Sequence, residues 1–161
     1  MKKLFYQHIY IYMKYVVAGS TGLIGKNLIN IISEDSEILA LTRRNFDFPD
    51  NVKEKIVDFD NEYDLPKAEH LFICLGFPVE LLDLVIMRKS VKKLFYKVDY
   101  DYVCKLAEKA KSSGIENLSV VSAVGASKNS FNYYLKTKGL MEEQLKDLNF
   151  HTLISFNLAI Y

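Results

Sequence analysis

The sequence predicts an α/β fold, a doubly wound and mostly parallel sheet with helices on both of its faces. From Met13 onward, short apolar runs rich in valine and isoleucine alternate with amphipathic stretches, which is the order expected of parallel strands joined by crossover helices. The chain has 161 residues and half of them are hydrophobic, so it is long enough to bury one core. We therefore expect one domain.

This alternation predicts six strands and three clear helices. The strands are expected near residues 14–18, 37–42, 53–57, 69–75, 117–122 and 151–156. The helices are expected over Gly22–Ser33, Asp99–Ser113 and Tyr133–Leu148. The second helix is expected to end at Gly114, because glycine adopts the left-handed conformation that commonly terminates a helix.

Residues 77–97 are harder to assign. The stretch Val79–Met87 is strongly apolar, and it is followed by a basic cluster made of Arg88, Lys89, Lys92, Lys93 and Lys97. A helix lying on a membrane surface is one interpretation. We favour a helix with an apolar inner face and a solvated basic face, because the chain shows no other membrane signal. The segment is then a variable insertion beside the ligand cleft.

Residues 1–12 are interpreted as an N-terminal extension that need not be native. They begin like a signal peptide, but Gln7, His8 and Lys14 interrupt the apolar run well short of the roughly 20 residues that span a bilayer. The strand pattern begins directly after Met13. We therefore expect the folded domain over residues 13–161 and no membrane span.

Charge and cysteine content restrict the partners and the compartment. Lysine and arginine number 21 against 20 aspartates and glutamates, so no net field attracts nucleic acid or anionic lipid. A small-molecule substrate and no nucleic acid are expected. Cys74 and Cys104 do not suggest a disulfide scaffold, which predicts a cytoplasmic location. No metal site is predicted, because the histidines lack a metal-ligand spacing.

Three glycines, Gly19, Gly22 and Gly25, lie between a predicted strand and a predicted helix. The first allows a tight turn, the second lets a pyrophosphate approach the backbone, and the third lets the helix pack close to the sheet. Unpaired amides at the helix start then face the anion. The pattern predicts a Rossmann-type dinucleotide site made of Gly19, Ser20, Thr21, Gly22, Leu23, Ile24 and Gly25. The alternative is a tight turn that binds no ligand.

The end of the second predicted strand bears on the choice of dinucleotide. A carboxylate at that place would bind the ribose hydroxyls of NAD, but the chain has Arg43 and Arg44 after Thr42. Guanidinium groups suit a 2′-phosphate, so the two arginines favour NADP(H) over NAD(H). The alternative is a pair of solvated surface arginines.

Seven motifs from Met13 onward resemble those of the atypical short-chain dehydrogenase/reductases, and among them the Tat-interacting-protein-like oxidoreductase branch. They are the glycine turn, Thr42-Arg43-Arg44, Val57-Asp58-Phe59, Cys74-Leu75-Gly76, Val98-Asp99-Tyr100-Asp101-Tyr102-Val103, Val121-Ser122-Ala123-Val124-Gly125-Ala126 and Tyr134-Leu135-Lys136-Thr137-Lys138-Gly139. The resemblance implies an NADP(H)-binding domain with Asp58 near the adenine and Gly76 on the cofactor wall. It also implies a catalytic trio of Ser122, Tyr134 and Lys138.

The chemistry of this trio follows from its placement. A spacing of four residues puts Tyr134 and Lys138 on one helical face, where the lysine charge favours the tyrosinate. We expect the pKa of Tyr134 to fall from about 10 toward neutrality, so that the phenol can protonate a carbonyl oxygen. Ser122, at the carboxyl end of a predicted strand, would orient that carbonyl. The alternative is an ordinary helix-face tyrosine with a surface lysine.

Asp99 stands where many relatives in the wider superfamily carry an asparagine near the active site. Aspartate directly before a helix is commonly its N-cap. We therefore interpret Asp99 as the N-cap of the helix that follows it.

Two functions remain open at this stage. The first is an NADPH-dependent oxidoreductase that acts on a small carbonyl-type substrate. The second is a catalytically weak or inactive NADP(H)-binding protein whose loaded surface another protein recognises. A fragment that folds poorly is a third, less informative possibility.

The second function is motivated by the sequence after the sixth predicted strand. Members of the family continue there with an arginine-proline-glycine turn and a substrate-side lobe, whereas this sequence reads Phe156-Asn157-Leu158-Ala159-Ile160-Tyr161. We expect the domain to lack that C-terminal lobe. We also expect an exposed sheet edge through which a homo-oligomer can form.

Overall fold

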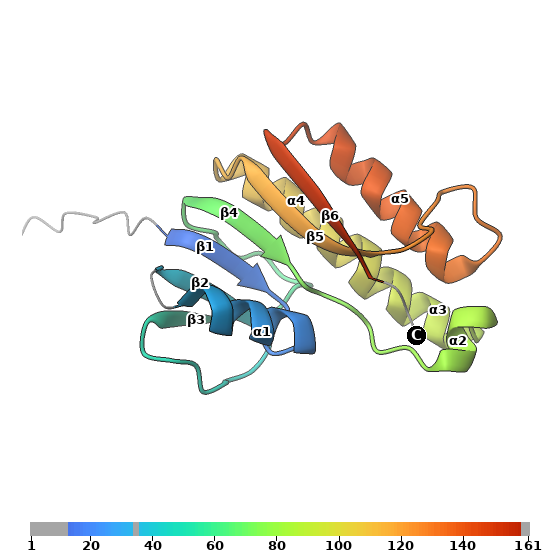
Figure 1. The fold of residues 1–161 in the computed structure, drawn as a ribbon, viewed down its shortest axis with the longest axis horizontal. Helices are drawn as coiled ribbons and strands as arrows, with labels where there is room; N and C mark the ends of the chain where they lie inside the picture. Colours follow the sequence, from blue (N-terminus) through green and yellow to red (C-terminus); the bar gives the residue numbers. More distant parts are fainter. Residues whose placement is uncertain (1–12, 34–35, 159–161) are drawn as a thin grey trace, which may run out of the picture.

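The computed structural model describes residues 13–33 and 36–158, which form a six-stranded sheet with helices on both faces (Figure 1). The strands are β1 (Met13–Ala18), β2 (Ile38–Thr42), β3 (Val52–Ile56), β4 (Ala68–Ile73), β5 (Asn117–Ala123) and β6 (Thr152–Leu158). Every neighbouring pair is parallel, and the order across the sheet is β3-β2-β1-β4-β5-β6. The predicted α/β class and doubly wound sheet are confirmed.

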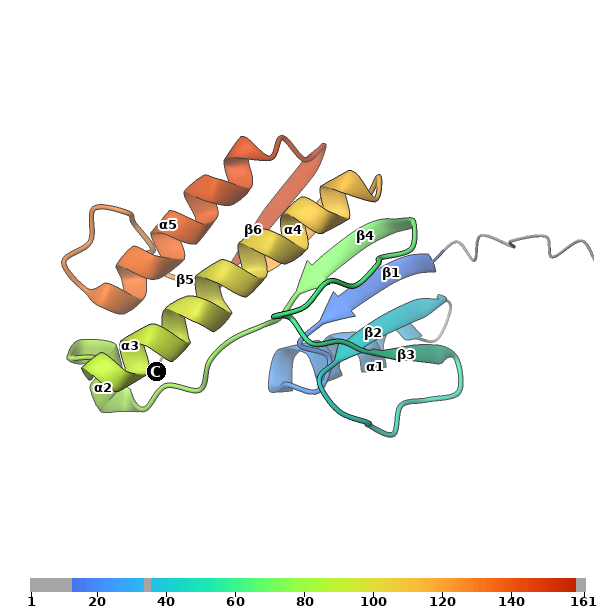
Figure 2. The same ribbon diagram turned by 180° about the vertical axis from the view of Figure 1, so that it is seen from behind.

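The helices are α1 (Leu23–Ile32), α2 (Leu81–Val85), α3 (Lys89–Tyr96), α4 (Val103–Ser112) and α5 (Tyr133–Asp147). Helix α1 covers one face of the sheet, and α3, α4 and α5 lie on the opposite face (Figures 1 and 2). The predicted helices match α1, α4 and α5 to within a few residues. The second one starts earlier than expected, because α3 continues through a π-helical turn, Lys97–Tyr102, directly into α4.

The alternation of side chains along β1 divides the core into two clusters. Val16 and Ala18 pack on the α4 and α5 face with residues such as Leu106. Val17 points to the other face and packs in a smaller cluster with Ile29 of α1. Strand β1 is thus buried on both sides, which fixes its carboxyl end in space.

Helix α2 does not follow the interpretation of residues 77–97. Its side chains Leu81, Leu82 and Val85 are 71%, 79% and 74% exposed. Asp83 is the buried residue instead, and its carboxylate accepts from Arg88 Nε at 3.1 Å and from Nη2 at 3.0 Å. The expected apolar inner face is therefore wrong for α2, which turns its apolar side chains outward.

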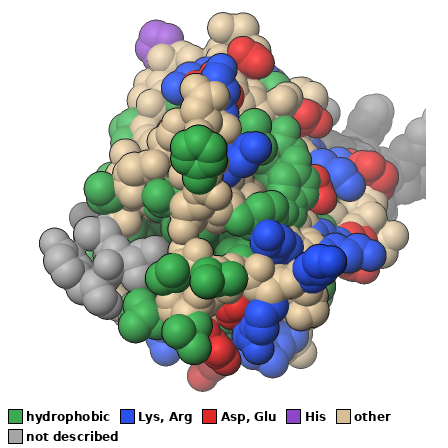
Figure 3. All heavy atoms as spheres, turned by 90° about the vertical axis from the view of Figure 1, so that its right-hand side faces the viewer, with side chains coloured by type: hydrophobic (Ala, Val, Ile, Leu, Met, Phe, Trp, Pro, Cys, Tyr) green, Lys and Arg blue, Asp and Glu red, His purple; other side chains and the backbone are tan. Residues whose placement is uncertain are grey.

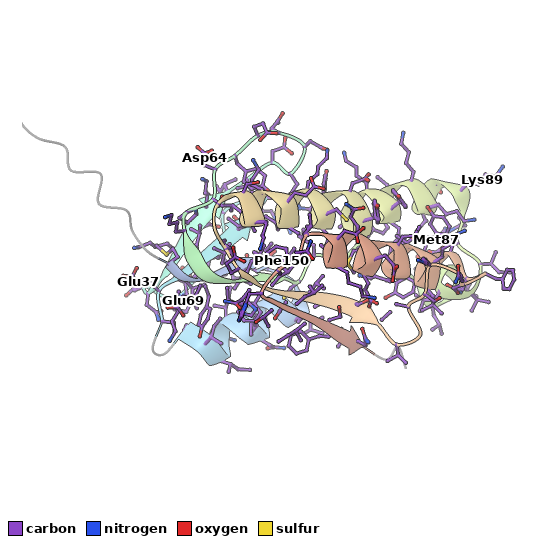
Figure 4. All side chains as sticks on the ribbon, turned by 90° about the horizontal axis from the view of Figure 1, so that it is seen from above. Glu37, Asp64, Glu69, Met87, Lys89 and Phe150 are labelled. Carbon is purple, nitrogen blue, oxygen red and sulfur yellow. The ribbon has the colours of Figure 1, made fainter. Side chains whose placement is uncertain are left out.

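Helix α3 agrees with the same interpretation, because Phe95 is buried while Lys89 and Lys93 are exposed. Met87 and Lys89 lie at one end of the molecule, and Glu37 and Glu69 lie at the other (Figure 4). The end that holds α2 and α3 shows hydrophobic side chains beside lysine and arginine side chains (Figure 3).

In the described part of the chain, no helix combines the length and the apolar character that a bilayer crossing requires. The interpretation of residues 1–12 concerns a segment outside the described residues. The division of the chain at Met13 and the missing C-terminal lobe stay predictions.

Candidate functional site

The glycine turn follows β1 and packs against the end of β4. Gly19 has a φ of +75°, and a Cβ at this position would overlap the carbonyl group of Cys74. Both the backbone conformation and the available space therefore require glycine. A Cβ at Gly25 would overlap the Gly19 carbonyl, so the third glycine lets α1 start directly over the turn. The turn presents the first amides of α1 at the carboxyl edge of the sheet.

These first amides have the features of an anion site. Gly22 is the N-cap of α1 and supplies no side-chain cap, and the first turn contains no acidic residue. The amides of Leu23, Ile24 and Gly25 are first-turn amides, which have no acceptor within a helix. The positive end of the helix dipole lies at the same place. An anion could therefore bind these amides without displacing a side chain of the turn.

Ser20 and Thr21 have different roles in the turn. The Ser20 hydroxyl is buried and donates to the Leu41 carbonyl oxygen at 3.0 Å, so its side chain fixes the turn to β2. Thr21 is exposed and lines the adjoining cleft. Ser20 can meet a ligand only through its backbone.

A cleft opens between the turn and the ends of β2 and β4. The predicted cofactor residues in its wall are Gly19, Thr21, Gly22, Arg43 and Gly76. Reasoning from sequence missed Phe59 and Tyr102, which also line the cleft and whose ring centroids lie 5.4 Å apart. Both residues belong to motifs that carry the family resemblance, and that membership was the only signal available for them.

The loop after β2 carries the two arginines. Arg43 lines the cleft, whereas Arg44 is exposed and lies outside the cleft wall. One Glu54 oxygen accepts from Thr42 Oγ1 at 3.0 Å and from the Phe46 amide at 2.9 Å. This carboxylate of β3 closes the loop on both sides of the arginines and holds Arg43 at the cleft.

Asp58 lies away from the cleft wall. Its carboxylate accepts from the Asp60 amide at 3.0 Å and from Asn61 Nδ2 at 2.7 Å, which closes a local turn. Phe59 is the residue of this motif that reaches the cleft. The role of Asp58 near the adenine therefore stays a prediction.

Lys138 of α5 lies in a buried ion pair. Its Nζ is 2.7 Å from Asp99 Oδ1, and the two side chains are 4% and 3% exposed. The same Nζ donates to the Val121 carbonyl oxygen at 3.2 Å, and the second oxygen of Asp99 accepts from the Phe77 amide at 2.7 Å. The pair joins α5, the end of β5 and the loop after β4.

The N-cap interpretation of Asp99 is wrong. The helical segment already begins at Lys89, and Asp99 lies inside the π-helical turn with its side chain buried. Burial raises the pKa of Asp99, and the ammonium of Lys138 and the Phe77 amide act in the opposite direction. Its carboxylate is thus a buried partner of the predicted catalytic lysine.

Tyr134 lies one turn before Lys138 on α5. Its ring is half-buried and stacks on Phe95 with centroids 5.1 Å apart. Burial raises the pKa of Tyr134 above its ordinary value, and the negative charge of Asp99 raises it further. The expected fall of this pKa is therefore wrong in the protein without ligands. The physical reason is the half-buried position of the ring, to which the Asp99 charge adds.

Ser122 lies on β5, directly after Val121. Its Oγ is buried and has no hydrogen-bond partner among the described residues. Leaving a buried hydroxyl without a partner costs about 1–3 kcal/mol. A hydroxyl in this state is suited to bind a polar group of a ligand.

Two contacts of α5 position Tyr134 and Lys138. Asn132 caps the helix by accepting from the Leu135 amide at 3.1 Å, and its Nδ2 donates to the Leu84 carbonyl oxygen at 2.6 Å. A Cβ at Gly139 would overlap the backbone of Ser127. Helix α5 therefore packs directly on the loop that follows β5.

Within the described residues, no group of three or more histidine, cysteine, aspartate or glutamate side chains is arranged to hold a metal ion. His70 Nε2 contacts Ser119 Oγ at 2.7 Å, and Cys74 and Cys104 are free thiols.

HTATIP2 from Rattus norvegicus is 33% identical to this chain over 155 residues, which cover 89% of the chain and 61% of HTATIP2. FMP52 from Candida glabrata is 34% identical over 146 residues, which cover 86% of the chain and 60% of FMP52. These matches support a resemblance to the Tat-interacting-protein-like branch of the atypical short-chain dehydrogenase/reductases. The chain spans about 60% of the length of these curated relatives. No family model matches the sequence.

Two solved structures share the fold of this chain. A UDP-glucuronic acid 4-epimerase from Bacillus cereus, solved with NAD, matches with a TM-score of 0.71 at 14% identity, over 89% of this chain and 55% of the epimerase. The oxidoreductase ylbE from Lactococcus lactis matches with a TM-score of 0.67 at 21% identity, over 89% of this chain and 68% of ylbE. The chain thus shares the Rossmann-like α/β fold of these proteins.

The predicted cytoplasmic location is wrong. The FMP52 relatives from Candida glabrata, Kluyveromyces lactis and Saccharomyces cerevisiae are named as mitochondrial proteins. Reduced thiols were the basis of the prediction, and they do not separate one reducing compartment from another.

Proposed function

We propose that the chain binds NADP(H) in the cleft at the glycine turn. The uncapped start of α1, without an acidic residue in its first turn, suits the pyrophosphate. Arg43 at the cleft suits a 2′-phosphate, and Gly76 leaves room on the wall because a Cβ there would lie 3.9 Å from its nearest neighbour, Asp99 Oδ1. The residues present therefore fit the cofactor. When bound, the reduced nicotinamide supplies a hydride.

We further propose that the protein is an oxidoreductase acting on a small carbonyl-type substrate. The observation that carries this proposal is the unpartnered, buried hydroxyl of Ser122, next to the carbonyl oxygen that holds Lys138. Ser122 Oγ donates a hydrogen bond to the substrate carbonyl oxygen. Tyr134 delivers a proton to the same oxygen, while Lys138 is held in place by β5 and Asp99.

The test is NADPH oxidation by the purified chain with a panel of small aldehydes and ketones. Tyr134→Phe is expected to lower turnover about 100-fold or more, because it removes the proton donor, while NADPH affinity changes little. Tyr133→Phe is the matched control, since Tyr133 is the adjacent tyrosine of α5 and lies under Lys92 Nζ at 4.9 Å. Equal turnover in Tyr134→Phe and the wild type would remove the proposal.

A binding protein is the second candidate, and one observation favours it. Helix α2 lies at the end of the molecule toward which β5 runs (Figure 1). Its side chains Leu81, Leu82 and Val85 are exposed, and so is Phe131, which lines a pocket beside α2. A surface of this kind suits a protein partner. A partner that binds only in the presence of NADPH would support this function, and steady turnover of any carbonyl in the panel would count against it.

We also propose that a second copy can associate along β6. This strand lies at one edge of the sheet, and its side chains Ile154, Phe156 and Leu158 are each at least two-fifths exposed. Phe156→Lys is expected to shift a dilution series in light scattering toward the monomer mass. A monomer mass for the wild type at all concentrations would contradict the proposal.

A further inference from the structure

We infer that the end of the protein that holds α2 docks on the surface of a bilayer containing anionic phospholipids. The exposed apolar side chains of α2 and Phe131 enter the membrane, and the lysines of α3 lie at the headgroups. The inference goes beyond the proposed functions, since it requires neither NADPH nor a substrate. Docking of this kind needs no helix that crosses the bilayer.

The apolar part of this surface consists of five side chains that are each at least 71% exposed. They are Leu81, Leu82, Val85, Ile86 and Phe131. Phe131 belongs to the loop after β5, and it lines one pocket together with Val85 and Ile86, so the two segments lie side by side. An apolar patch of this kind on a folded domain marks a site for a protein or a membrane.

Two polar contacts fix this surface in place. Asp83 is the buried residue of α2, and its carboxylate accepts from Arg88 Nε at 3.1 Å and from Nη2 at 3.0 Å. A helix as short as α2 presents one side to the protein, and Asp83 occupies that side. Asn132 Nδ2 donates to the Leu84 carbonyl oxygen at 2.6 Å, which holds the neighbouring Phe131 beside α2. The local structure therefore directs the apolar side chains outward.

A basic cluster adjoins these apolar side chains. Lys89, Lys92 and Lys93 lie on α3, and none of the ion pairs between described residues includes any of them. Lys92 lines the same pocket as Phe131. Lys89 and Lys93 are exposed, and their spacing of four residues puts them on one side of the helix. Figure 3 shows hydrophobic and basic side chains together at this end of the molecule.

The charge beside the apolar side chains selects the partner. The acidic side chains of this segment, Glu80 and Asp83, are both paired with Arg88, so they do not neutralise the lysines. The whole chain has a net charge of +1, and the attraction is therefore local. An anionic bilayer offers negative headgroups to the lysines and an acyl layer to the apolar side chains.

The high exposure of the apolar side chains favours a bilayer over a protein partner for this surface. A protein interface requires a partner of complementary shape, with a packing density close to that of a protein interior. Acyl chains rearrange around an inserted side chain and require no such match. Side chains that project far from the protein therefore suit a bilayer.

The first test is flotation of the purified full chain, without cofactor, on vesicles of phosphatidylcholine with and without phosphatidylserine. The wild type is expected to float with the anionic vesicles and much less with the neutral ones, and added salt is expected to weaken the binding. The inference is overturned by a chain that stays unbound to anionic vesicles at low salt, and also by equal binding to both kinds of vesicle.

The second test removes the charge. Lys89→Gln combined with Lys93→Gln is expected to weaken binding to the anionic vesicles about tenfold or more, because each lysine near such a surface contributes roughly a fivefold gain. Lys53→Gln combined with Lys67→Gln is the matched control. Lys53 pairs with Glu37, which lies at the opposite end of the molecule (Figure 4), and Lys67 directly precedes β4. Equal losses in the two double variants overturn the inference.

The third test follows insertion of the apolar side chains. The chain has no tryptophan, so Phe131→Trp introduces a single reporter. Its emission is expected to shift to shorter wavelength on addition of anionic vesicles, because the ring leaves water. Ile31→Trp is the matched control, since Ile31 is 76% exposed near the C-terminal end of α1, and no shift is expected there. An unshifted Phe131→Trp, or equal shifts in both variants, overturns the inference.

The fourth test removes apolar surface from α2. Val85→Ser combined with Ile86→Ser is expected to weaken vesicle binding about tenfold or more and to leave the folded state intact, because both side chains are exposed. If the wild type binds no vesicles but binds a protein that this variant does not bind, the surface belongs to a protein partner and the inference is overturned. Absence of NADPH oxidation with every carbonyl overturns the proposed reaction alone and leaves the vesicle results in place.

Discussion

The glycine turn and the corner formed by Ser122, Tyr134 and Lys138 lie at the same edge of one sheet, yet they are held by different forces. The turn is fixed by backbone sterics, since side chains at Gly19 and Gly25 would overlap main-chain atoms. In the second region, Lys138 is fixed by a buried ion pair with Asp99 and by a hydrogen bond to the Val121 carbonyl oxygen.

This difference has a chemical meaning. Backbone sterics hold the turn rigid, and no charged side chain is needed for this. The amides of α1 therefore stay available for phosphate. A buried ion pair holds a side chain in place and also sets the charge that its neighbours experience. For Tyr134, burial is the first cause of the raised pKa and the charge of Asp99 is the second.

The largest effect is expected from a substitution that breaks the Lys138–Asp99 ion pair. Lys138→Met leaves Asp99 buried without a partner, and it is expected to lower the free energy of unfolding by about 3–5 kcal/mol, measured by urea denaturation. Adding Asp99→Asn to Lys138→Met is expected to restore much of the lost free energy of unfolding, because the double variant has no buried charge at this place.

Lys97→Met is the control for that prediction, because it breaks the partly exposed pair with Asp60. A surface pair of this kind contributes about 0–1 kcal/mol. Similar losses of stability for Lys138→Met and Lys97→Met would show that the Lys138–Asp99 pair does not hold this region in place.

The next effect concerns the glycine turn. Gly19→Ala combines a φ of +75° with overlap of the Cys74 carbonyl, so we expect about 100-fold weaker NADPH binding as well as reduced stability. NADPH fluorescence and urea denaturation measure the two losses. Gly114→Ala is the matched control, because its φ is +82° but no atom lies within 4 Å of its Cβ position. It is expected to cost about 1–2 kcal/mol of stability and to leave NADPH affinity unchanged.

The glycine turn was predictable from sequence because its geometry is determined by the types of a few neighbouring residues. A missing side chain at Gly19, Gly22 and Gly25 is visible directly, and the strand before the turn and the helix after it follow from apolar periodicity. The boundaries of β1 and α1 agree with that prediction to within a residue or so.

The region of Ser122, Tyr134 and Lys138 was predictable only in part. Ser122, Tyr134 and Lys138 were found through family motifs, but the partner of Lys138 was not. A π-helical turn changes which residues face inward, and no local pattern marks it. Asp99 was therefore interpreted as a cap, and the pKa of Tyr134 was expected to move in the wrong direction.

The outward apolar side chains of α2 were missed for another reason. Periodicity shows that Leu82 and Val85 share a face, but it does not show whether the described chain offers that face a surface to pack on.

A smaller effect is expected from Arg43→Ala, which tests the preference for NADPH over NADH. Arg43→Ala is expected to weaken NADPH binding about tenfold and to leave NADH binding unchanged, because a charge-assisted bond to the 2′-phosphate is lost. Arg44→Ala is the comparison variant and is expected to do less, since Arg44 lies outside the cleft wall. Equal losses for NADPH and NADH in Arg43→Ala would contradict the role of this arginine.

The smallest effect concerns the two thiols. Burial raises the pKa of Cys74 to about 11 and that of Cys104 to about 12, against 9.0 for an ordinary thiol. The folded state thus binds these protons more tightly than the unfolded state. The resulting stability is fully present below pH 9 and is lost as the pH rises toward 11 and 12.

Iodoacetamide labelling of the folded chain near neutral pH, followed by mass spectrometry, checks this prediction. Labelling of both cysteines is expected to be much slower than that of a free thiol, because little thiolate is present. Bound NADPH is expected to slow Cys74 further, since Cys74 lines the cleft, and to leave Cys104 unaffected. Rapid labelling of the folded chain would contradict the burial of the thiols.

Binding at the glycine turn is tested by titrating the purified chain with NADPH, with nicotinamide fluorescence and thermal stability recorded on the same samples. We expect saturable binding and a matching rise in melting temperature for the wild type and for Gly114→Ala, and about 100-fold weaker binding with a smaller rise for Gly19→Ala. The proposed dinucleotide site would be contradicted by an absence of binding to the folded wild type, or by equal binding to Gly19→Ala.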